Sequence, residues 1–279
     1  MHRHQPETRR RVQPGFRTAL AFVTTLVLLP GPCGHAAEYR ELNTDRDAFT
    51  PATTTVEEGL RLLESSYTWI DNRGTPPTNS FPELLIRLGA RERLEWRFGF
   101  NFEQGSGGSV VSAVEGGEGL LGDELESESN LLYGFKVRVT DQRGWLPRSC
   151  VIMEGFTPVS GDVWGTEPAS TYAFGWELPR EWRFDAAIRY VYADSTEGRF
   201  DKWLPSAVLR IPLTDRWEVH GEWFGAWTAG LGDDTVRPFV GPGTHYMITP
   251  TFEIGCRMGW GLSRDAAAYF VDSGIGWHF

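Results

Sequence analysis

The chain has 279 residues, 13% of them aromatic, and a formal net charge of −10. This acidic balance argues against a nucleic-acid partner, because binding nucleic acid normally requires a concentrated basic surface. Beyond residue 37 no apolar run approaches the roughly 18 uninterrupted residues that a membrane-spanning helix needs, since charged residues interrupt every candidate. If this chain crosses a membrane, it must therefore cross it as strands.

Residues 1–37 have the three-part layout of a cleaved secretory signal peptide. A basic stretch precedes the apolar run Ala19–Leu29, and the helix-breaking Pro30-Gly31-Pro32 and a cleavage site near Ala36 or Ala37 follow it. The run is too short to span a bilayer stably, which disfavours a signal anchor. A lipoprotein signal at Cys33 is the other alternative, although the residues before Cys33 match the usual lipobox poorly.

Residues 38–58 form a polar segment between this leader and the first strand-like pattern. They are too polar for a membrane strand, and they contain Asp45, Arg46 and Asp47. We expect the segment to lie in the periplasm or to tuck into the lumen of a barrel as a plug, with Arg46 pairing with inward acidic residues.

From residue 59 onward, apolar and polar residues alternate with a period of two, which predicts strands. Residues 94–103 show the pattern most clearly, and residues 131–140, 182–192 and 252–262 repeat it. A soluble sandwich is the alternative, but its core would be filled with branched aliphatics. Here the apolar faces are rich in Trp, Phe and Tyr and oppose charge and glycine, which is typical of a transmembrane barrel with apolar residues toward lipid and polar residues toward the lumen.

Twelve such segments predict an all-β fold, an antiparallel up-and-down transmembrane β-barrel of about 12 strands over residues 59–279. Tight turns alternate with mostly longer connections, as in bacterial barrels whose short turns and both termini are periplasmic. The weakest expected strands are 145–156 and 236–248. The full set is 59–71, 80–88, 94–103, 130–140, 145–156, 169–178, 182–193, 202–213, 217–227, 236–248, 252–262 and 268–279.

The chain ends with Ile275, Trp277 and Phe279 on one face of the last expected strand. A terminal aromatic residue with another two positions earlier resembles the insertion signal read by the barrel-assembly machinery. Together with the leader, it predicts export to the outer membrane of a Gram-negative-type cell. Outer-membrane lipids and lipopolysaccharide are the expected surroundings.

Charged residues that point inward by their place in the alternation are the candidate lumen lining. They would either pair across strands as a structural ladder or line a permeation path that selects solutes by size and charge. The main candidates are Glu83, Arg87, Glu95, Arg97, Lys136, Arg138, Arg183, Asp185, Arg189, Glu218, His220, Glu222, Glu253 and Arg257. The same alternation of inward and outward positions also places six further charged residues inward, namely Arg61, Glu103, Glu177, Lys202, Arg210 and Asp272.

No enzyme, cofactor or metal site is predicted. The histidines after the leader are His220, His245 and His278, and neither a nucleophile elbow nor an adjacent set of Ser, His and acid accompanies them. Cys150 and Cys256 are too distant in sequence to indicate a disulfide framework or a metal cluster.

The longest expected loop, Gln104–Ser129, begins with glycine and serine and ends with acidic residues. That composition is typical of a flexible, solvated surface loop. If external loops carry the function, the protein is a structural or surface-interaction barrel without a conducting pore, and this is the alternative to transport.

Three segments after the leader resemble the opening of a known family. They are Asn43–Thr50, Val56–Glu64 and Ser80–Gly89, the last with its Pro-Glu-Leu-Leu strand. The family is that of the outer-membrane transporters named for the meta-cleavage pathway of phenol degradation. Asp47 and Ala48 replace its usual proline and second acid. The resemblance covers essentially the mature chain and implies a barrel for passive passage of small organic solutes, including aromatic or hydrophobic ones.

Overall fold

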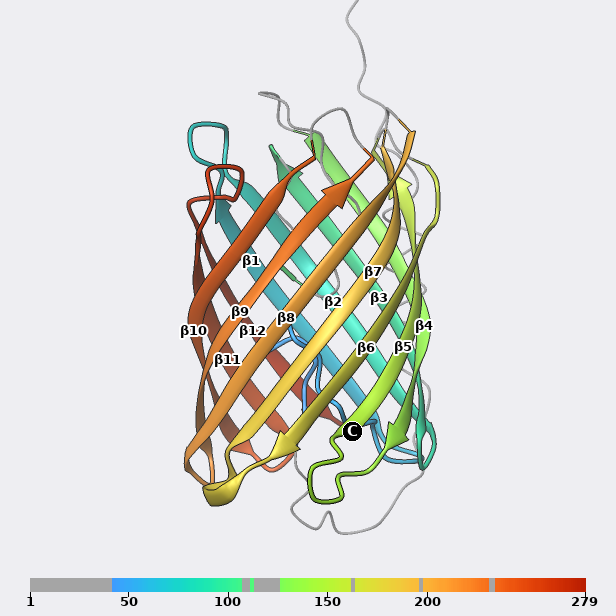
Figure 1. The fold of residues 1–279 in the computed structure, drawn as a ribbon, viewed down its shortest axis with the longest axis vertical. Coiled ribbons are helices and arrows are strands. Elements are labelled where there is room, and N and C mark those ends of the chain that lie inside the picture. The colour runs from blue at the N-terminus through green and yellow to red at the C-terminus, as the bar shows by residue number, and fades with distance from the viewer. Residues whose placement is uncertain (1–41, 107–110, 113–125, 162–163, 196–197, 231–233) are drawn as a thin grey trace, which may run out of the picture.

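The computed structural model describes residues 42–106, 111–112, 126–161, 164–195, 198–230 and 234–279. Twelve strands form one closed antiparallel barrel, in which each strand pairs with its neighbours in sequence and β1 also pairs with β12 (Figure 1). The predicted fold class and strand number are confirmed, including the two weakest strands, β5 and β10. The strands are β1 (Arg61–Asp71), β2 (Thr78–Arg91), β3 (Leu94–Gly105), β4 (Glu126–Thr140), β5 (Arg148–Ser160), β6 (Glu167–Glu177), β7 (Arg183–Ser195), β8 (Gly198–Thr214), β9 (Trp217–Ala229), β10 (Val236–Thr249), β11 (Phe252–Gly261) and β12 (Tyr269–His278).

Successive connections alternate between the two ends of the barrel. Their lengths do not divide as expected, because only two residues separate β7 from β8 at the loop end and seven separate β4 from β5 at the turn end. The turn end carries the short connections after β2 and β8, the 3-10 turn η1 (Pro179–Glu181) and the C-terminus (Figure 1). The opposite end is called the loop end. β5 begins later than expected because Arg143 and Leu146 bond to each other within the preceding turn. Among the described residues, no helix is long and apolar enough to span a membrane.

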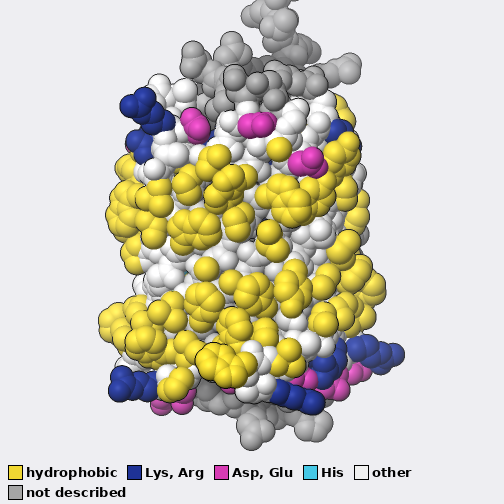
Figure 2. Space-filling model, viewed as in Figure 1, with side chains coloured by type: hydrophobic (Ala, Val, Ile, Leu, Met, Phe, Trp, Pro, Cys, Tyr) yellow, Lys and Arg dark blue, Asp and Glu magenta, His cyan; other side chains and the backbone are white. Residues whose placement is uncertain are grey.

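The face of the barrel in Figure 2 carries many apolar side chains between two rims that hold the charged ones. Outward aromatic side chains such as Trp96, Tyr133 and Trp203 are 45–47% exposed. Exposed apolar surface of this extent is unfavourable in water and favourable in lipid. The barrel therefore has the exterior of a membrane-spanning protein.

The first strand departs from the expected alternation. Leu62, Glu64, Ser66 and Thr68 of β1 are buried in the lumen, so Arg61 lies on the outward face and its inward assignment was wrong. Arg61 is the first residue of β1, at the turn end. An outward charge at this position is solvated by water beyond the membrane interface, so it does not have to face the lumen.

The lumen is filled in two layers. Toward the turn end the inward residues are mostly charged, whereas toward the loop end aromatic and aliphatic residues lie among charged ones such as Lys202 and Arg237. The apolar part departs from the polar lumen expected from the alternation. Along β9 the inward face changes from Glu218, His220 and Glu222 to Phe224 and Ala226. The buried rings that define the aromatic layer are Phe156, Phe200, Phe224, Phe239 and Phe270.

Residues 42–58, the inner segment, run inside the turn-side half of the barrel as far as Val56 and reach the surface at Glu57 and Glu58 (Figure 1). They form neither helix nor strand, yet Asp45, Ala48 and Thr50 are completely buried. Buried backbone groups need hydrogen-bond partners, so an irregular segment here depends on side chains of the barrel wall. Those side chains make up the candidate site.

Candidate functional site

Asp45 of the inner segment is the centre of a buried cluster of ion pairs. Lys136 donates to both carboxylate oxygens, at 2.9 and 3.0 Å, and Arg97 binds Oδ2. Arg87 places its guanidinium 3.5 Å from Oδ1. The three cations come from the adjacent strands β2, β3 and β4, and all three side chains meet at the carboxylate of Asp45. All four side chains are at most 2% exposed, a setting in which charges persist only when paired.

The wall supplies further carboxylates to the same cations. Arg87 donates to both oxygens of Glu95, at 2.8 and 2.9 Å, and to Glu64 at 3.2 Å. Arg97 donates to Glu95 at 3.0 Å and to Glu154 at 2.7 Å. Charge-assisted hydrogen bonds of this kind are stronger than neutral ones. The cluster therefore joins the inner segment and the wall into one unit.

Two of these carboxylates also hold the backbone of the inner segment. Glu64 accepts the N–H groups of Asp45 and Arg46, both at 2.9 Å, through one oxygen. Glu95 accepts the N–H group of Val56 at 2.7 Å. Wall side chains thus replace the partners that a helix or sheet would provide.

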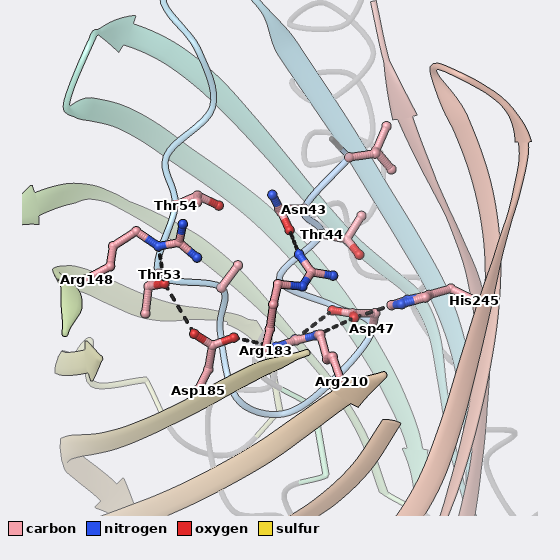
Figure 3. A pocket seen from close by; sticks show the side chains of 12 residues that line it. Asn43, Thr44, Asp47, Thr53, Thr54, Arg148, Arg183, Asp185, Arg210 and His245 are labelled. Carbon is pink, nitrogen blue, oxygen red and sulfur yellow. Dashed lines mark hydrogen bonds and ion pairs between the residues drawn. The ribbon is translucent and has the colours of Figure 1, made fainter. Parts of the chain in front are cut away.

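Asp47 is the centre of a second cluster (Figure 3). Its carboxylate lies 3.3 and 3.4 Å from Arg210 and 3.2 Å from Nδ1 of His245. Arg210 also donates to Asp185 at 2.8 Å, and Thr53 donates to Asp185 at 3.2 Å. The inner segment is therefore attached to β7, β8 and β10 as well as to β2, β3 and β4.

The two aspartates of the inner segment are ionised at neutral pH. Burial raises the pKa of Asp45, but Arg87, Lys136 and Arg97 outweigh burial and hold that pKa well below its ordinary value. Burial likewise raises the pKa of Asp47, and Arg210 with the hydrogen bond from His245 brings it well below the ordinary value. Both carboxylates thus keep the charge on which their ion pairs depend.

A third set of contacts involves β9, β11 and β12. Arg46 pairs with Asp272 at 3.1 Å, and Arg257 pairs with Asp272 at 2.8 Å and with Glu222 at 3.3 Å. Glu222 in turn accepts the backbone N–H of Thr50 at 2.8 Å. The inner segment is consequently bonded to strands on all sides of the lumen.

Phe49 joins the inner segment to the aromatic layer. Its ring stacks on Phe224 at 4.4 Å with an interplanar angle of 5°. Phe224 also contacts the rings of Phe239 and Phe270, at 5.2 and 5.9 Å. The guanidinium of Arg189 lies 5.6 Å from the centre of the Phe49 ring, within cation–π distance. The inner segment thus borders the apolar layer from its turn side.

Two cavities lie on the turn side of the inner segment. A vestibule of about 840 Å³ opens at the turn end. A polar cavity of about 10 Å³, with room for roughly one water, lies against Asp47, Arg210 and His245 (Figure 3). Leu42, Arg183 and His245 line both, so the vestibule narrows onto the inner segment.

The model of the family described as "Putative MetA-pathway of phenol degradation" matches residues 44–279. The chain belongs to this family. The match covers most of the inner segment and all twelve strands. Among curated proteins no relative matches the chain.

Outer-membrane barrels are found among similar solved structures. The NanC porin has 9% identity and a TM-score of 0.48, covering 78% of this chain and 98% of that chain. The translocator domain of the autotransporter NalP from Neisseria meningitidis has 11% identity and a TM-score of 0.46, covering 80% and 90%. The CymD monoaromatic hydrocarbon channel has 11% identity and a TM-score of 0.44, covering 80% and 88%. These similarities concern the barrel fold alone.

In this member of the phenol-degradation family, about half of the main expected lumen residues lie in the clusters described above, namely Arg87, Glu95, Arg97, Lys136, Asp185, Glu222 and Arg257. Arg183 and Glu218 are partly exposed at the vestibule, where they pair at 2.6 Å. Arg138 lies at the turn-end rim, between Glu92 and Asp141. The expected residues that are buried inside the barrel are Asp45, Arg46, Asp47, Glu83, Arg87, Glu95, Arg97, Lys136, Asp185, Arg189, His220, Glu222, Glu253 and Arg257.

Glu64 and Glu154 belong to the Asp45 cluster and were not expected. The alternation of β1 was counted from Arg61, which assigned Glu64 to the wrong face. Glu154 stands in the weakly alternating β5, where no face could be chosen with the pattern alone. A usable signal existed, since an acidic residue in the middle of a membrane strand has to face the lumen.

Ile275, Trp277 and Phe279 share the outward face of the chain end. The rings of Trp277 and Phe279 are 4.8 Å apart. The backbone of Phe279 also bonds to Arg61 at 3.0 Å, within the seam where β12 closes against β1. The leader with Cys33, and most of Gln104–Ser129, lie outside the described residues.

Proposed function

We propose that this chain is an outer-membrane channel for passive passage of small aromatic or hydrophobic organic solutes, closed at rest by its inner segment. The observation that carries the proposal is the aromatic layer, whose five phenylalanines face the lumen. Water-filled porin lumens are polar, so a layer of buried rings in the lumen favours a solute that leaves water readily. Membership of a family named for phenol degradation supports the same solute class.

The stacking of Phe49 on Phe224 provides a place for a planar solute. A solute ring that entered the layer would take the position of Phe49 at 4.4 Å from Phe224, because aromatic pairs are worth about 0.5–1.5 kcal/mol beyond area burial. Passage requires the inner segment to leave the lumen. The ion pairs of Asp45 and Asp47 therefore set how readily the channel opens.

In this proposal the turn end faces the periplasm, because bacterial barrels keep their short turns on that side. Residues 1–37 serve as a cleaved signal peptide. Ile275, Trp277 and Phe279 serve as the insertion signal for the barrel-assembly machinery. Outer-membrane lipids and lipopolysaccharide surround the apolar belt, and the protein is not an enzyme.

A structural or surface-interaction barrel without a conducting pore is the second candidate. The inner segment itself favours it, since Asp45 and Thr50 are completely buried and bonds to strands on all sides hold the segment. In this candidate the inner segment never leaves the lumen, and the aromatic layer only stabilises the barrel.

Uptake into proteoliposomes separates the two candidates. Benzoate is the probe because its charge slows unaided passage through lipid, and acetate is the non-aromatic comparison. We expect the protein to speed benzoate entry more than acetate entry, and Phe224→Leu to reduce that preference. Phe184→Leu, on the outward face, is the matched control and should leave it unchanged. Benzoate entry no faster than in protein-free liposomes would refute the channel and support the second candidate.

A further inference from the structure

Asp47, His220 and His245 bring three potential metal ligands together from the inner segment, β9 and β10. We propose that they bind a divalent transition-metal ion, with Zn²⁺ as the representative ion, and so link the inner segment to the wall. One ligand atom of each residue lies within 4.8 Å of the others. Nδ1 of His245 is 3.2 Å from Oδ2 of Asp47, close to the roughly 3.3 Å between ligands of a tetrahedral zinc ion.

His220 gives independent support, because it is a buried polar side chain without partners. It is 4% exposed, and among the described residues neither ring nitrogen has a hydrogen-bond partner. Leaving a buried polar group unsatisfied typically costs about 1–3 kcal/mol, and native proteins seldom do so. A metal ion would satisfy one nitrogen of this ring.

The strand register aims His220 at the site. His220 pairs with Gly243 of β10, and a Cβ atom at Gly243 would lie only 2.2 Å from Nε2 of His220. The imidazole therefore lies over the glycine, which leaves room for it. His245 is two residues further along the same inward face of β10, and the two imidazole centres are 5.8 Å apart.

Glu218 orients the second histidine as a metal site requires. Its carboxylate lies 2.7 Å from Nε2 of His245, so that Nε2–H can donate to Glu218 while Nδ1 faces Asp47. A metal ion bound there would replace the proton that Nδ1 shares with Asp47. Metal-binding histidines usually donate their other N–H group to such a carboxylate.

Arg210 is the positive charge that opposes a cation here. It lies 3.3 and 3.4 Å from Asp47 and 2.8 Å from Asp185, so its charge is shared between the two carboxylates. Asp47 thus keeps lone pairs for a metal, and Glu218 adds negative charge beside His245. The small cavity at Asp47 and His245 has room for about one water as a further ligand.

Calorimetric titration with ZnCl₂ tests the site in purified, tag-free, chelator-treated protein, independently of solute passage. We expect one Zn²⁺ per chain, and Co²⁺ in its place should give the visible absorption of a tetrahedral site. His220→Gln and Asp47→Asn should each weaken binding at least 10-fold. Glu218→Gln should weaken it about 10–100-fold, as loss of an orienting carboxylate does.

His278→Gln, at the end of β12, is the matched control and should bind Zn²⁺ as the unaltered protein does. Heat-dependent gel migration checks that each variant barrel is folded. If a variant in a strand, such as His220→Gln, does not fold, Asp47→Asn still tests the site, because Asp47 lies outside the strands. Absence of stoichiometric Zn²⁺ binding by the unaltered protein would overturn the proposal. So would unchanged affinity in folded His220→Gln or Asp47→Asn, or an equal loss in His278→Gln.

Discussion

A single carboxylate, that of Asp45, explains much of why an irregular segment stays inside this barrel. A buried charge is unfavourable without partners, and the same holds for Arg87, Arg97 and Lys136 if Asp45 is absent. The segment and the wall therefore stabilise each other. Cys150 is completely buried on the wall, with its Sγ 3.8 Å from the carbonyl oxygen of Ala52, so its reactivity reports whether the inner segment is in place.

Replacing Asp45 by asparagine should release the inner segment. Removing one partner of a buried ion pair typically costs about 3–5 kcal/mol, and each 1.4 kcal/mol is about a factor of ten in an equilibrium. We expect a water-soluble maleimide to label Cys150 at least about 100-fold faster in Asp45→Asn, measured with the exposed Cys256 replaced by serine.

Glu58→Gln is the matched control for this prediction. Glu58 pairs with Arg91 at 3.2 Å, but the two side chains are 55% and 77% exposed, and exposed pairs contribute about 0–1 kcal/mol. Its labelling rate should stay close to that of the unaltered protein. Slow labelling in Asp45→Asn would show that the ion pairs of Asp45 do not hold the segment.

Acid should release the inner segment as well. The pKa values of Asp45 and Asp47 are lowered in the folded state. Their stabilisation is therefore complete above the unfolded value of about 3.9 and is lost as the pH falls through the folded values. Labelling of Cys150 by a dithiodipyridine, which reacts with thiols in acid, should be equally slow at pH 7 and pH 5 and accelerate below about pH 4. Acceleration already between pH 7 and pH 5 would assign release to other groups.

At the scale of the strand, the position of an outward residue along the barrel decides how much a charge there lowers the free energy of unfolding. Ile188 is an outward residue in the middle of β7, whereas Val236 is an outward residue at the loop-end start of β10. In lipid, Ile188→Arg should lower the free energy of unfolding by about 2–4 kcal/mol and Val236→Arg by about 0–1 kcal/mol. Denaturant unfolding in bilayers measures both, and equal costs would contradict the apolar belt.

The alternation of apolar and polar residues also determines which parts of this fold can be predicted from the sequence. Period two predicted all twelve strands, because each outward face must meet lipid along its whole length. It assigns Phe224 to the face of Glu222 and Phe239 to the face of Arg237, but both rings have the same chemistry as outward residues. The pattern alone therefore does not show that the inward rings meet in one layer. The error at Arg61 arose where the strand meets water and both faces tolerate charge.

At the scale of the whole molecule, the barrel and the inner segment obey different rules. The barrel is specified by a repeated pattern, whereas the inner segment is held by individual pairs such as Arg46 with Asp272, which are 226 residues apart. Composition predicted that residues 38–58 are not a membrane strand. Which acid meets which cation depends on barrel closure and strand register, and no local pattern encodes either.

The inner segment occupies the lumen, and the proposed channel opens only when this segment leaves. Benzoate uptake by an Ala52→Cys, Cys256→Ser variant tests this gating, because the carbonyl oxygen of residue 52 is 3.8 Å from Sγ of Cys150 and a thiol introduced at this residue is expected near Cys150. We predict that oxidation joins the introduced thiol to Cys150 in a disulfide, detected by mass spectrometry, and abolishes benzoate entry, and that reduction restores entry. Failure of the disulfide to form, or equal entry in the oxidised and reduced states, would show that the inner segment does not close the barrel.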